Sequence, residues 1–209
     1  MRFLAPLLAA ISLAAPVRAG DLAVTLLTPG GKPVANAVVM VKPQGGSPRT
    51  PIRFPWPYRV AQREMQFEPF VLIVPVGAEV AFPNLDPFHH HVYSFSKAKT
   101  FELKLYGQAE TRRVRFDRPG VVAIGCNIHD NMSAYIRVVD TPFAAKTAAS
   151  GLSVVRDLPP GPATVTVWHP YLKAAQGEVT QRVVIPASGA LRLAVTGDIR
   201  PSRIRRGGY

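Results

Sequence analysis

Short runs of apolar and β-branched residues recur along the chain, and Gly, Pro, Asn and Asp separate them. No segment after the N-terminal region shows the period of an amphipathic helix. Many short strands with turn residues between them are typical of an all-β sandwich or barrel. The expected strands are residues 22–27, 37–41, 70–74, 79–82, 91–95, 121–124, 134–139, 153–155, 164–168, 181–185 and 190–195.

Two stretches of different composition divide this series of strands. Residues 43–58 are rich in Pro, Gly and Arg, and residues 140–150 form a second expected connector. The flanks outside them are too small to make a sandwich each, so we expect residues 20–50 and 141–199 to pair into one discontinuous domain. Residues 59–140 then form a domain inserted between two of its strands. The alternative, three loosely attached pieces, would leave strand edges unpaired.

The N-terminus carries a short basic start and an apolar run that ends in small residues before position 20. This pattern predicts a secretory signal peptide over residues 1–19. The run is too short for a permanent bilayer span, although an N-terminal membrane anchor is the alternative. No later stretch is long and apolar enough to cross a membrane. We therefore expect a soluble, periplasmic mature protein.

The chain is strongly basic, with 25 Lys and Arg against 13 Asp and Glu, a net charge of +12. Such an excess suggests nucleic acid in a cytoplasmic protein, but an exported protein rarely meets it. Acidic protein partners or an anionic membrane surface are the expected counterparts. The densest cluster lies in residues 200–209, which we interpret as a basic, solubilising tail.

The chain has a single cysteine, Cys126, so no internal disulfide can form. A free thiol in an oxidising compartment is a liability unless it is protected or used, which favours a ligand or a nucleophile. Cys126, His129 and Met132 lie within seven residues, between two expected strands. A thiolate and two imidazoles with a weak axial thioether form the ligand set of mononuclear electron-transfer copper.

The second imidazole can come from His89, His90 or His91, which open the strand after Asn84. Soft thiolate and thioether ligands favour copper over calcium or magnesium, and zinc seldom uses Met. Two alternatives need no copper. One is a buried structural cysteine beside unrelated histidines, and the other is a Cys–His nucleophilic pair, for which the sequence shows no orienting partner.

Residues 66–139 resemble the plastocyanin-like cupredoxins. The resemblance rests on residues 74–84, on Asp86 with His90 four residues later, and on the stretch from Pro119 to Met132. It implies a Greek-key β-sandwich whose usual work is one-electron transfer. It also implies one type 1-like copper ion held by His90, Cys126, His129 and Met132.

The same resemblance leaves some roles open. His91 stands where the family commonly has Asn, so it would brace the two ligand loops, and it is the alternative first ligand. Asn84 opens the stretch that supplies the first histidine. The gap from His129 to Met132 is shorter than in plastocyanin, as in related short-loop cupredoxins, so Met132 is either the axial ligand or a core residue. We expect His89 to face solvent.

The flanks resemble a second module. Residues 31–41 and 157–168 are similar to the two ends of the carboxypeptidase regulatory-like sandwich, an Ig-like β-sandwich without catalytic residues. This implies a cupredoxin inserted into a docking or stabilising unit, with His169 as a turn residue. Some exported cupredoxins of this layout carry the label methylamine utilization protein, which implies a link to periplasmic amine oxidation.

Together these features predict a non-enzymatic copper protein that passes single electrons between periplasmic redox proteins. The alternatives are a copper-binding or delivery protein and a docking module whose metal is structural.

Overall fold

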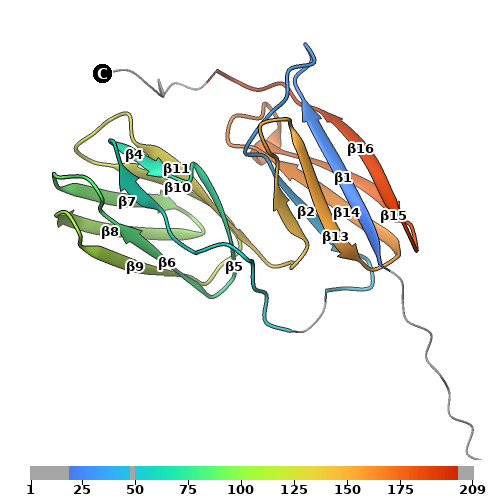
Figure 1. Cartoon of the computed structure of the whole chain (residues 1–209), viewed down its shortest axis with the longest axis horizontal. Helices are drawn as coiled ribbons and strands as arrows, with labels where there is room; N and C mark the ends of the chain where they lie inside the picture. The colour runs from blue at the N-terminus through green and yellow to red at the C-terminus, as the bar shows by residue number, and fades with distance from the viewer. Residues whose placement is uncertain (1–18, 48–49, 202–209) are drawn as a thin grey trace, which may run out of the picture.

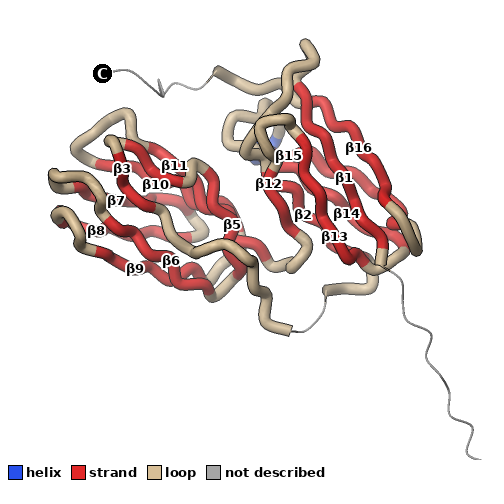
Figure 2. Tube along the Cα trace, in the orientation of Figure 1, coloured by secondary structure: helices blue, strands red, loops and turns tan. Residues whose placement is uncertain are grey.

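The computed structural model describes residues 19–47 and 50–201, which form two β-rich lobes (Figures 1 and 2). The predicted signal peptide, apart from Ala19, and residues 202–209 of the predicted tail lie outside these residues. Within them the only helical element is the three-residue 3-10 turn Ala175–Gly177. No helix in the described part of the chain is long and apolar enough to span a membrane. The expectation of an all-β protein is confirmed.

The central lobe, residues 59–140, contains a five-stranded sheet in the order β5-β11-β10-β7-β8. β5 and β11 run parallel, and the other neighbours are antiparallel. Two short pairs, β3 with β4 and β6 with β9, complete the lobe. The strands are β3 (Ala61–Arg63), β4 (Gln66–Glu68), β5 (Val71–Pro75), β6 (Ala78–Pro83), β7 (His90–Ser96), β8 (Lys99–Tyr106), β9 (Thr111–Phe116), β10 (Gly120–Cys126) and β11 (Ser133–Val139).

The core of the central lobe lies between the five-stranded sheet and the β6–β9 pair. Alternate residues of each strand point inward because successive side chains of a strand face opposite sides. Val80 and Phe82 of β6 meet Val122 of β10 and Ile136 of β11 in one buried cluster. Cys126 and Met132 belong to the same cluster, so the core reaches the end of the lobe where β10 ends.

The flanking lobe contains a three-stranded sheet, β13-β1-β16, and a four-stranded sheet, β12-β2-β14-β15. Each sheet joins strands that precede the central lobe to strands that follow it. This pairing supports the discontinuous domain, which we keep as a proposal. The strands are β1 (Gly20–Leu27), β2 (Val38–Pro43), β12 (Ala144–Lys146), β13 (Leu152–Leu158), β14 (Gly161–Trp168), β15 (Glu178–Ile185) and β16 (Ala190–Thr196).

The two lobes share a set of buried apolar side chains, which we call the junction cluster. Arg137 of β11 crosses this junction, with its guanidinium 2.8 Å from Glu178 of β15 and 5.7 Å from the ring centre of Trp168. The lobes therefore pack directly on one another instead of hanging on a flexible linker. The junction cluster consists of Val38, Met40, Val71, Ile73, Val139, Ala144 and Trp168.

The free edge of β5 is capped by side chains. Trp56 donates its indole N–H to the carbonyl of Ile73 at 2.8 Å. Lys146 donates its ammonium to the carbonyl of Val71 at 3.0 Å. Unpaired carbonyls on an edge strand invite another strand to pair, so these two bonds protect the edge. Both donors come from segments that the sequence had marked only as connectors.

Candidate metal centre

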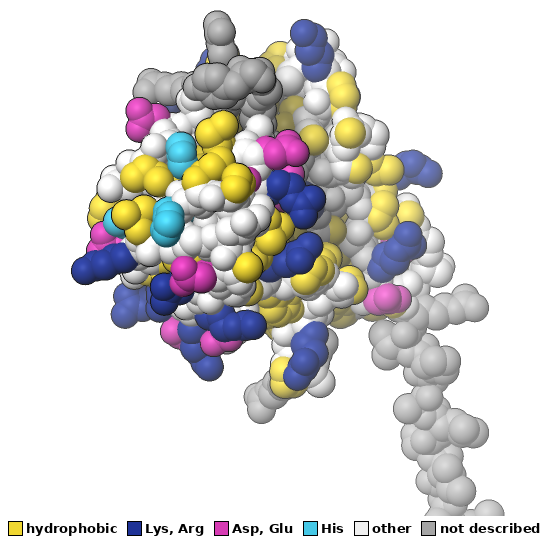
Figure 3. Space-filling model, turned by 60° about the vertical axis from the view of Figure 1, so that its left-hand side comes forward, with side chains coloured by type: hydrophobic (Ala, Val, Ile, Leu, Met, Phe, Trp, Pro, Cys, Tyr) yellow, Lys and Arg dark blue, Asp and Glu magenta, His cyan; other side chains and the backbone are white. Residues whose placement is uncertain are grey.

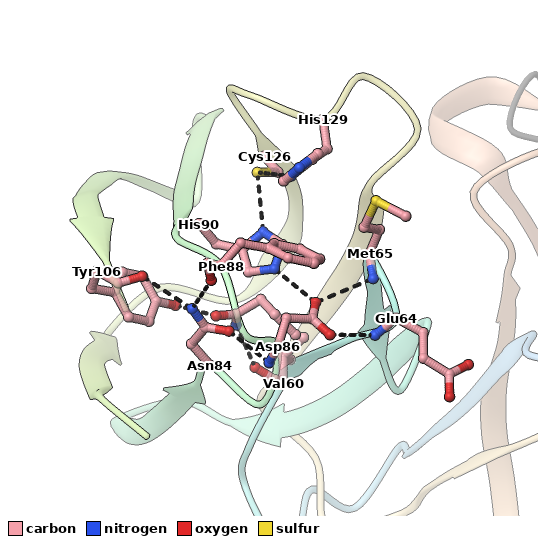
Figure 4. Close-up of polar contacts among 11 residues, drawn as sticks. Val60, Glu64, Met65, Asn84, Asp86, Phe88, His90, Tyr106, Cys126 and His129 are labelled. Atoms are coloured by element: carbon pink, nitrogen blue, oxygen red, sulfur yellow. Dashed lines mark hydrogen bonds and ion pairs between the residues drawn. The ribbon is translucent and has the colours of Figure 1, made fainter. Parts of the chain in front are cut away.

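The candidate site lies at one end of the central lobe, where the turn between β10 and β11 meets the start of β7 (Figure 4). The turn is closed by backbone bonds: Cys126 N–H donates to Met132 O at 3.3 Å, and Met132 N–H donates to His129 O at 3.0 Å. Asn127 N–H donates to His91 O at 3.0 Å and so ties the turn to β7. Three side chains from these two segments converge on one point.

His90, Cys126 and His129 bring one nitrogen, one sulfur and one nitrogen within 4.8 Å of one another. The Sγ atom of Cys126 lies 3.6 Å from Nδ1 of His90 and 3.6 Å from Nδ1 of His129. Transition-metal bonds to Cys sulfur and His nitrogen are about 2.0–2.3 Å long, so one ion can bridge such separations. The donor set also fits copper, for which thiolate and imidazole are suitable ligands.

The cluster is buried except at one side. His90 has none of its surface exposed and Cys126 only 4%, whereas His129 is partly exposed. The ring of Phe88 packs against both histidines, with its centre 5.3 Å from that of His90 and 5.5 Å from that of His129, while the two imidazole centres lie 5.0 Å apart. Among the described residues of the site, His129 and Phe88 are the ones that reach the surface.

The electrostatics of the cluster favour a thiolate. Burial opposes ionisation of Cys126, but hydrogen bonds from His90, from the backbone of His91 and Ile128, and from His129 outweigh it and lower the pKa to about 6. The pKa of His90 is raised: burial lowers it, and the contacts with Cys126 and Asp86 more than compensate. A thiolate is the form of cysteine that binds metal.

The structure distinguishes the three consecutive histidines. His90 faces Cys126, whereas the Nε2 atom of His91 lies 2.9 Å from a carboxylate oxygen of Glu102. His91 does join the two loops, but through its carbonyl rather than its imidazole. His89 is exposed to solvent. Alternation along β7 explains the difference, because neighbouring residues of a strand point to opposite faces.

Asn84 organises the loop that leads to His90, and its side chain does not reach the cluster. Its amide nitrogen donates to the carbonyl of Phe88 at 2.8 Å and to that of Tyr106 at 3.0 Å. Its amide oxygen accepts the N–H of Asp86 at 2.9 Å. Met132 is 2% exposed and shares the core of the lobe with Cys126.

Two residues near the cluster received no role from the sequence. Asp86 lies behind His90, with Oδ2 at 2.8 Å from Nε2, and Phe88 packs on both histidine rings. The spacing of four residues between Asp86 and His90 was visible in the sequence. It could not be interpreted as a contact, because the loop between them is neither a strand nor a helix.

No protein-family model and no curated protein matches the chain. Among solved structures, it is similar to a copper-containing nitrite reductase from Thermus scotoductus SA-01, with 28% identity, a TM-score of 0.39 and coverage of 45% of this chain. The match spans only 25% of the reductase. A purple cupredoxin from Nitrosopumilus maritimus matches 39% of this chain and 98% of its own length, with 19% identity and a TM-score of 0.36.

A reduced Cu(I) form of amicyanin matches 40% of this chain and 82% of its own length, with 22% identity and a TM-score of 0.37. The central lobe is a β-sandwich that brings His90, Cys126 and His129 together at one end, between the start of β7 and the tight turn after β10. The cluster of His90, Cys126 and His129 is consistent with one type 1 copper site.

Proposed function

We propose that the chain is a periplasmic, mononuclear copper protein that transfers single electrons between redox partners. The observation that carries this proposal is the convergence of His90, Cys126 and His129 within 4.8 Å at the end of a β-sandwich. These three residues would hold the copper ion, and Met132 is the fourth proposed ligand. A bound copper ion would supply the redox chemistry by accepting and releasing one electron.

The protein's part in that chemistry is to keep its ligands still. His90 and Cys126 are buried on strands β7 and β10, and backbone bonds close the turn that carries His129. Ligands that cannot rearrange give similar geometry in both oxidation states of copper, which lowers the reorganisation that accompanies electron transfer. Close packing of the surrounding core maintains this rigidity.

Electrons would enter and leave beside His129, the most exposed of the proposed ligands. Phe88 packs on the ring of His129, and the loops that form the site also expose the apolar side chains of Leu85 and Ile128. Figure 3 shows histidine and apolar side chains side by side on this face, with Lys and Arg below them. An apolar rim suits a transient protein contact, and the basic neighbours favour acidic partners.

The periplasmic location and the partners are part of the proposal. Support for export comes from the predicted signal peptide, residues 1–19, and from the lone thiol that a metal would protect. The likeness of the layout to proteins labelled for methylamine utilization makes an amine-oxidising system the first partner to test.

Copper delivery is the second candidate, and the partial exposure of His129 supports it, because an acceptor could approach the ion from that side. Reversible voltammetry combined with a Cu(I)-chelator challenge separates the two. An electron carrier shows a reversible one-electron wave and retains copper in both oxidation states. Rapid loss of Cu(I) to the chelator would contradict electron transfer and favour delivery.

A further inference from the structure

Asp86 makes contacts that link the proposed copper site to a distant part of the chain. Its Oδ1 atom accepts the N–H of Glu64 at 2.6 Å, and its Oδ2 atom accepts the N–H of Met65 at 3.1 Å. The same Oδ2 atom lies 2.8 Å from Nε2 of His90 (Figure 4). Asp86 is 4% exposed, so its carboxylate interacts mainly with these two backbone N–H groups and with Nε2 of His90.

Glu64 and Met65 form the two-residue turn between β3 and β4, with φ values of 51° and 54°. A hairpin turn of this kind strongly prefers Asn-Gly, because both central residues must adopt positive φ. Glu and Met supply neither the small side chain nor the local hydrogen bonds that ease this conformation. Asp86 stabilises the turn from outside by accepting both of its N–H groups.

Hydrogen bonds of the loop that carries Asp86 also fix the position of its carboxylate. Its backbone N–H donates to Asn84 Oδ1 at 2.9 Å. The neighbouring Leu85 N–H donates to Gln62 O, at the middle of β3, at 2.9 Å. The loop and the hairpin therefore hold the carboxylate between them, with one oxygen facing the ring of His90.

This contact selects a tautomer of His90. A carboxylate can only accept hydrogen bonds, so the Nε2 atom that faces it carries the hydrogen. When the ring is neutral, as it must be to bind a metal, Nδ1 then has its lone pair free, and this atom lies 3.6 Å from Cys126 Sγ. In metal sites such an outer partner sets the orientation of the histidine and raises its strength as a ligand.

We propose that Asp86 is a positioning residue that holds His90 with Nδ1 bare and aimed at Cys126, and that it ties the β3–β4 hairpin to the metal centre. The inference rests on the proposed function, because it assigns Nδ1 of His90 as a copper ligand. Through Asp86, the β3–β4 hairpin, which carries no proposed ligand, would influence the orientation of His90.

Asp86→Asn tests the proposal with the smallest change of shape. The new amide offers one oxygen to three N–H groups, so its NH2 must face the turn or His90. Where it faces His90, the ring is driven to the other tautomer, whose Nδ1 carries hydrogen and cannot bind copper. We expect copper affinity about 10–100-fold weaker, the usual effect of losing an outer partner. The midpoint potential should rise, because a negative group that favours Cu(II) is lost.

A second set of variants separates the effect of Asp86 on the orientation of His90 from its effect on the stability of the β3–β4 hairpin. The double variant Glu64→Asn, Met65→Gly places the preferred residues at the turn and makes it independent of Asp86. In this background Asp86→Asn should cost less stability than in the native chain. Its effects on copper affinity and potential should persist in full. Glu64→Gln is the matched control, since it removes an acidic side chain from the same turn and leaves the backbone N–H in place.

The direct readout is the tautomer of His90 in the metal-free protein. It is measured from the 15N chemical shifts of the ring at alkaline pH, where the imidazole is neutral. We expect the Nε2–H form in the native chain and in Glu64→Gln, and a shift toward Nδ1–H in Asp86→Asn in both backgrounds. An unchanged tautomer together with unchanged copper affinity in Asp86→Asn would overturn the proposal.

These results are distinguishable from failure of the proposed function. If the native protein binds copper through its thiolate and Asp86→Asn changes nothing, electron transfer stands and the role of Asp86 fails. If the native protein binds no copper, the proposed function fails, and the positioning of a copper ligand fails with it. The tautomer then shows only whether Asp86 orients the ring.

Discussion

The two ends of the central lobe are held by different forces. At the site end, buried polar side chains make specific hydrogen bonds, among them those of Asn84, Asp86 and His90. At the other side, the junction cluster joins the lobes through aliphatic side chains and Trp168, and the ion pair of Arg137 with Glu178 crosses beside it. Apolar burial is non-directional, whereas a buried hydrogen bond is lost when its geometry changes.

This difference assigns separate tasks to the two regions. We expect the junction to carry much of the free energy of unfolding, and the site end to carry the geometry of the metal centre. A change at the junction should therefore lower stability and leave the copper spectrum nearly intact. A change at the site end should cost less stability and alter the copper spectrum far more.

The largest loss of stability is expected from Trp168→Ala. Trp168 is 2% exposed and packs edge-to-face on Tyr135 of β11, with ring centres 6.0 Å apart. Truncating a buried tryptophan costs about 3–5 kcal/mol. Urea unfolding monitored by circular dichroism measures it, and Val184→Ala, at a side chain that is 69% exposed on β15, is the control with a change within about 0.5 kcal/mol. A Trp168→Ala cost as small as that of the control would contradict the assignment of stability to the junction.

The next largest effect is expected from Asn84→Ala, at the site end. The substitution leaves the carbonyl of Tyr106, which is bonded in a buried environment, and that of Phe88, which is partly buried, without their donor, at a total cost of about 2–3 kcal/mol. The loop to His90 loses its support, so the thiolate-to-copper absorption should weaken far more than in Trp168→Ala. Visible spectra of both variants decide the point, with Gln181→Ala, at an exposed position of β15, as control. A normal spectrum in Asn84→Ala would contradict the claim that the site end, unlike the junction, sets the geometry of the metal centre.

A pH effect is expected at the junction side, from His169 after β14. Burial lowers the pKa of His169 to about 4, against a hydrogen bond with the backbone of Ala35 that raises it. Below the ordinary pKa of 6.5 the unfolded chain binds a proton that the folded chain excludes, so this contribution to stability is lost as pH falls. Between about pH 7.5 and pH 5 the loss is about 2 kcal/mol.

Urea unfolding at the two pH values measures this loss, and His169→Gln, which cannot titrate, should show a smaller one. Equal pH dependence in the two proteins would contradict the expectation. The neighbouring geometry supports a neutral ring, because Nδ1 of His169 accepts the N–H of Tyr171 at 3.2 Å.

The smallest effect is expected from salt. The β8–β9 region exposes Lys104, Arg112, Arg113 and Arg115, and the three arginines are paired with Glu110, Glu79 and Asp117. These charges should steer an acidic redox partner, so its electron-exchange rate should fall several-fold as ionic strength rises. Stopped-flow exchange measurements over a salt series test this, with a neutral small-molecule reductant as control. A rate that does not change with salt would rule out steering by this surface.

The strands that the sequence predicted are those with strong apolar runs. β5 and β11 have buried residues along much of their length, and their sequences show it directly. β8 and β9 were missed because charged residues occupy their exposed positions, and only a few side chains, such as Tyr106 and Phe116, face the core. β3, β4 and β12 are three residues long, too short for a periodic pattern.

The metal cluster was predictable because its chemistry depends on rare residue types at close spacing. A single cysteine three residues before a histidine marked one half of the site, and the run of histidines marked the other. The choice of His90 over His91 required the resemblance as well as the residues. The role of Asp86 was out of reach, since it depends on a hairpin that lies more than twenty residues earlier in the chain.

The central claim is that Cys126 binds copper together with His90 and His129. The most direct test is the visible absorption spectrum of the Cu(II)-loaded protein beside that of Cys126→Ser. We expect an intense thiolate-to-copper band that disappears on reduction and is absent from the variant. A colourless native protein that binds no copper would contradict the claim, and the chain would then be a β-sandwich docking protein with a buried, unused thiol.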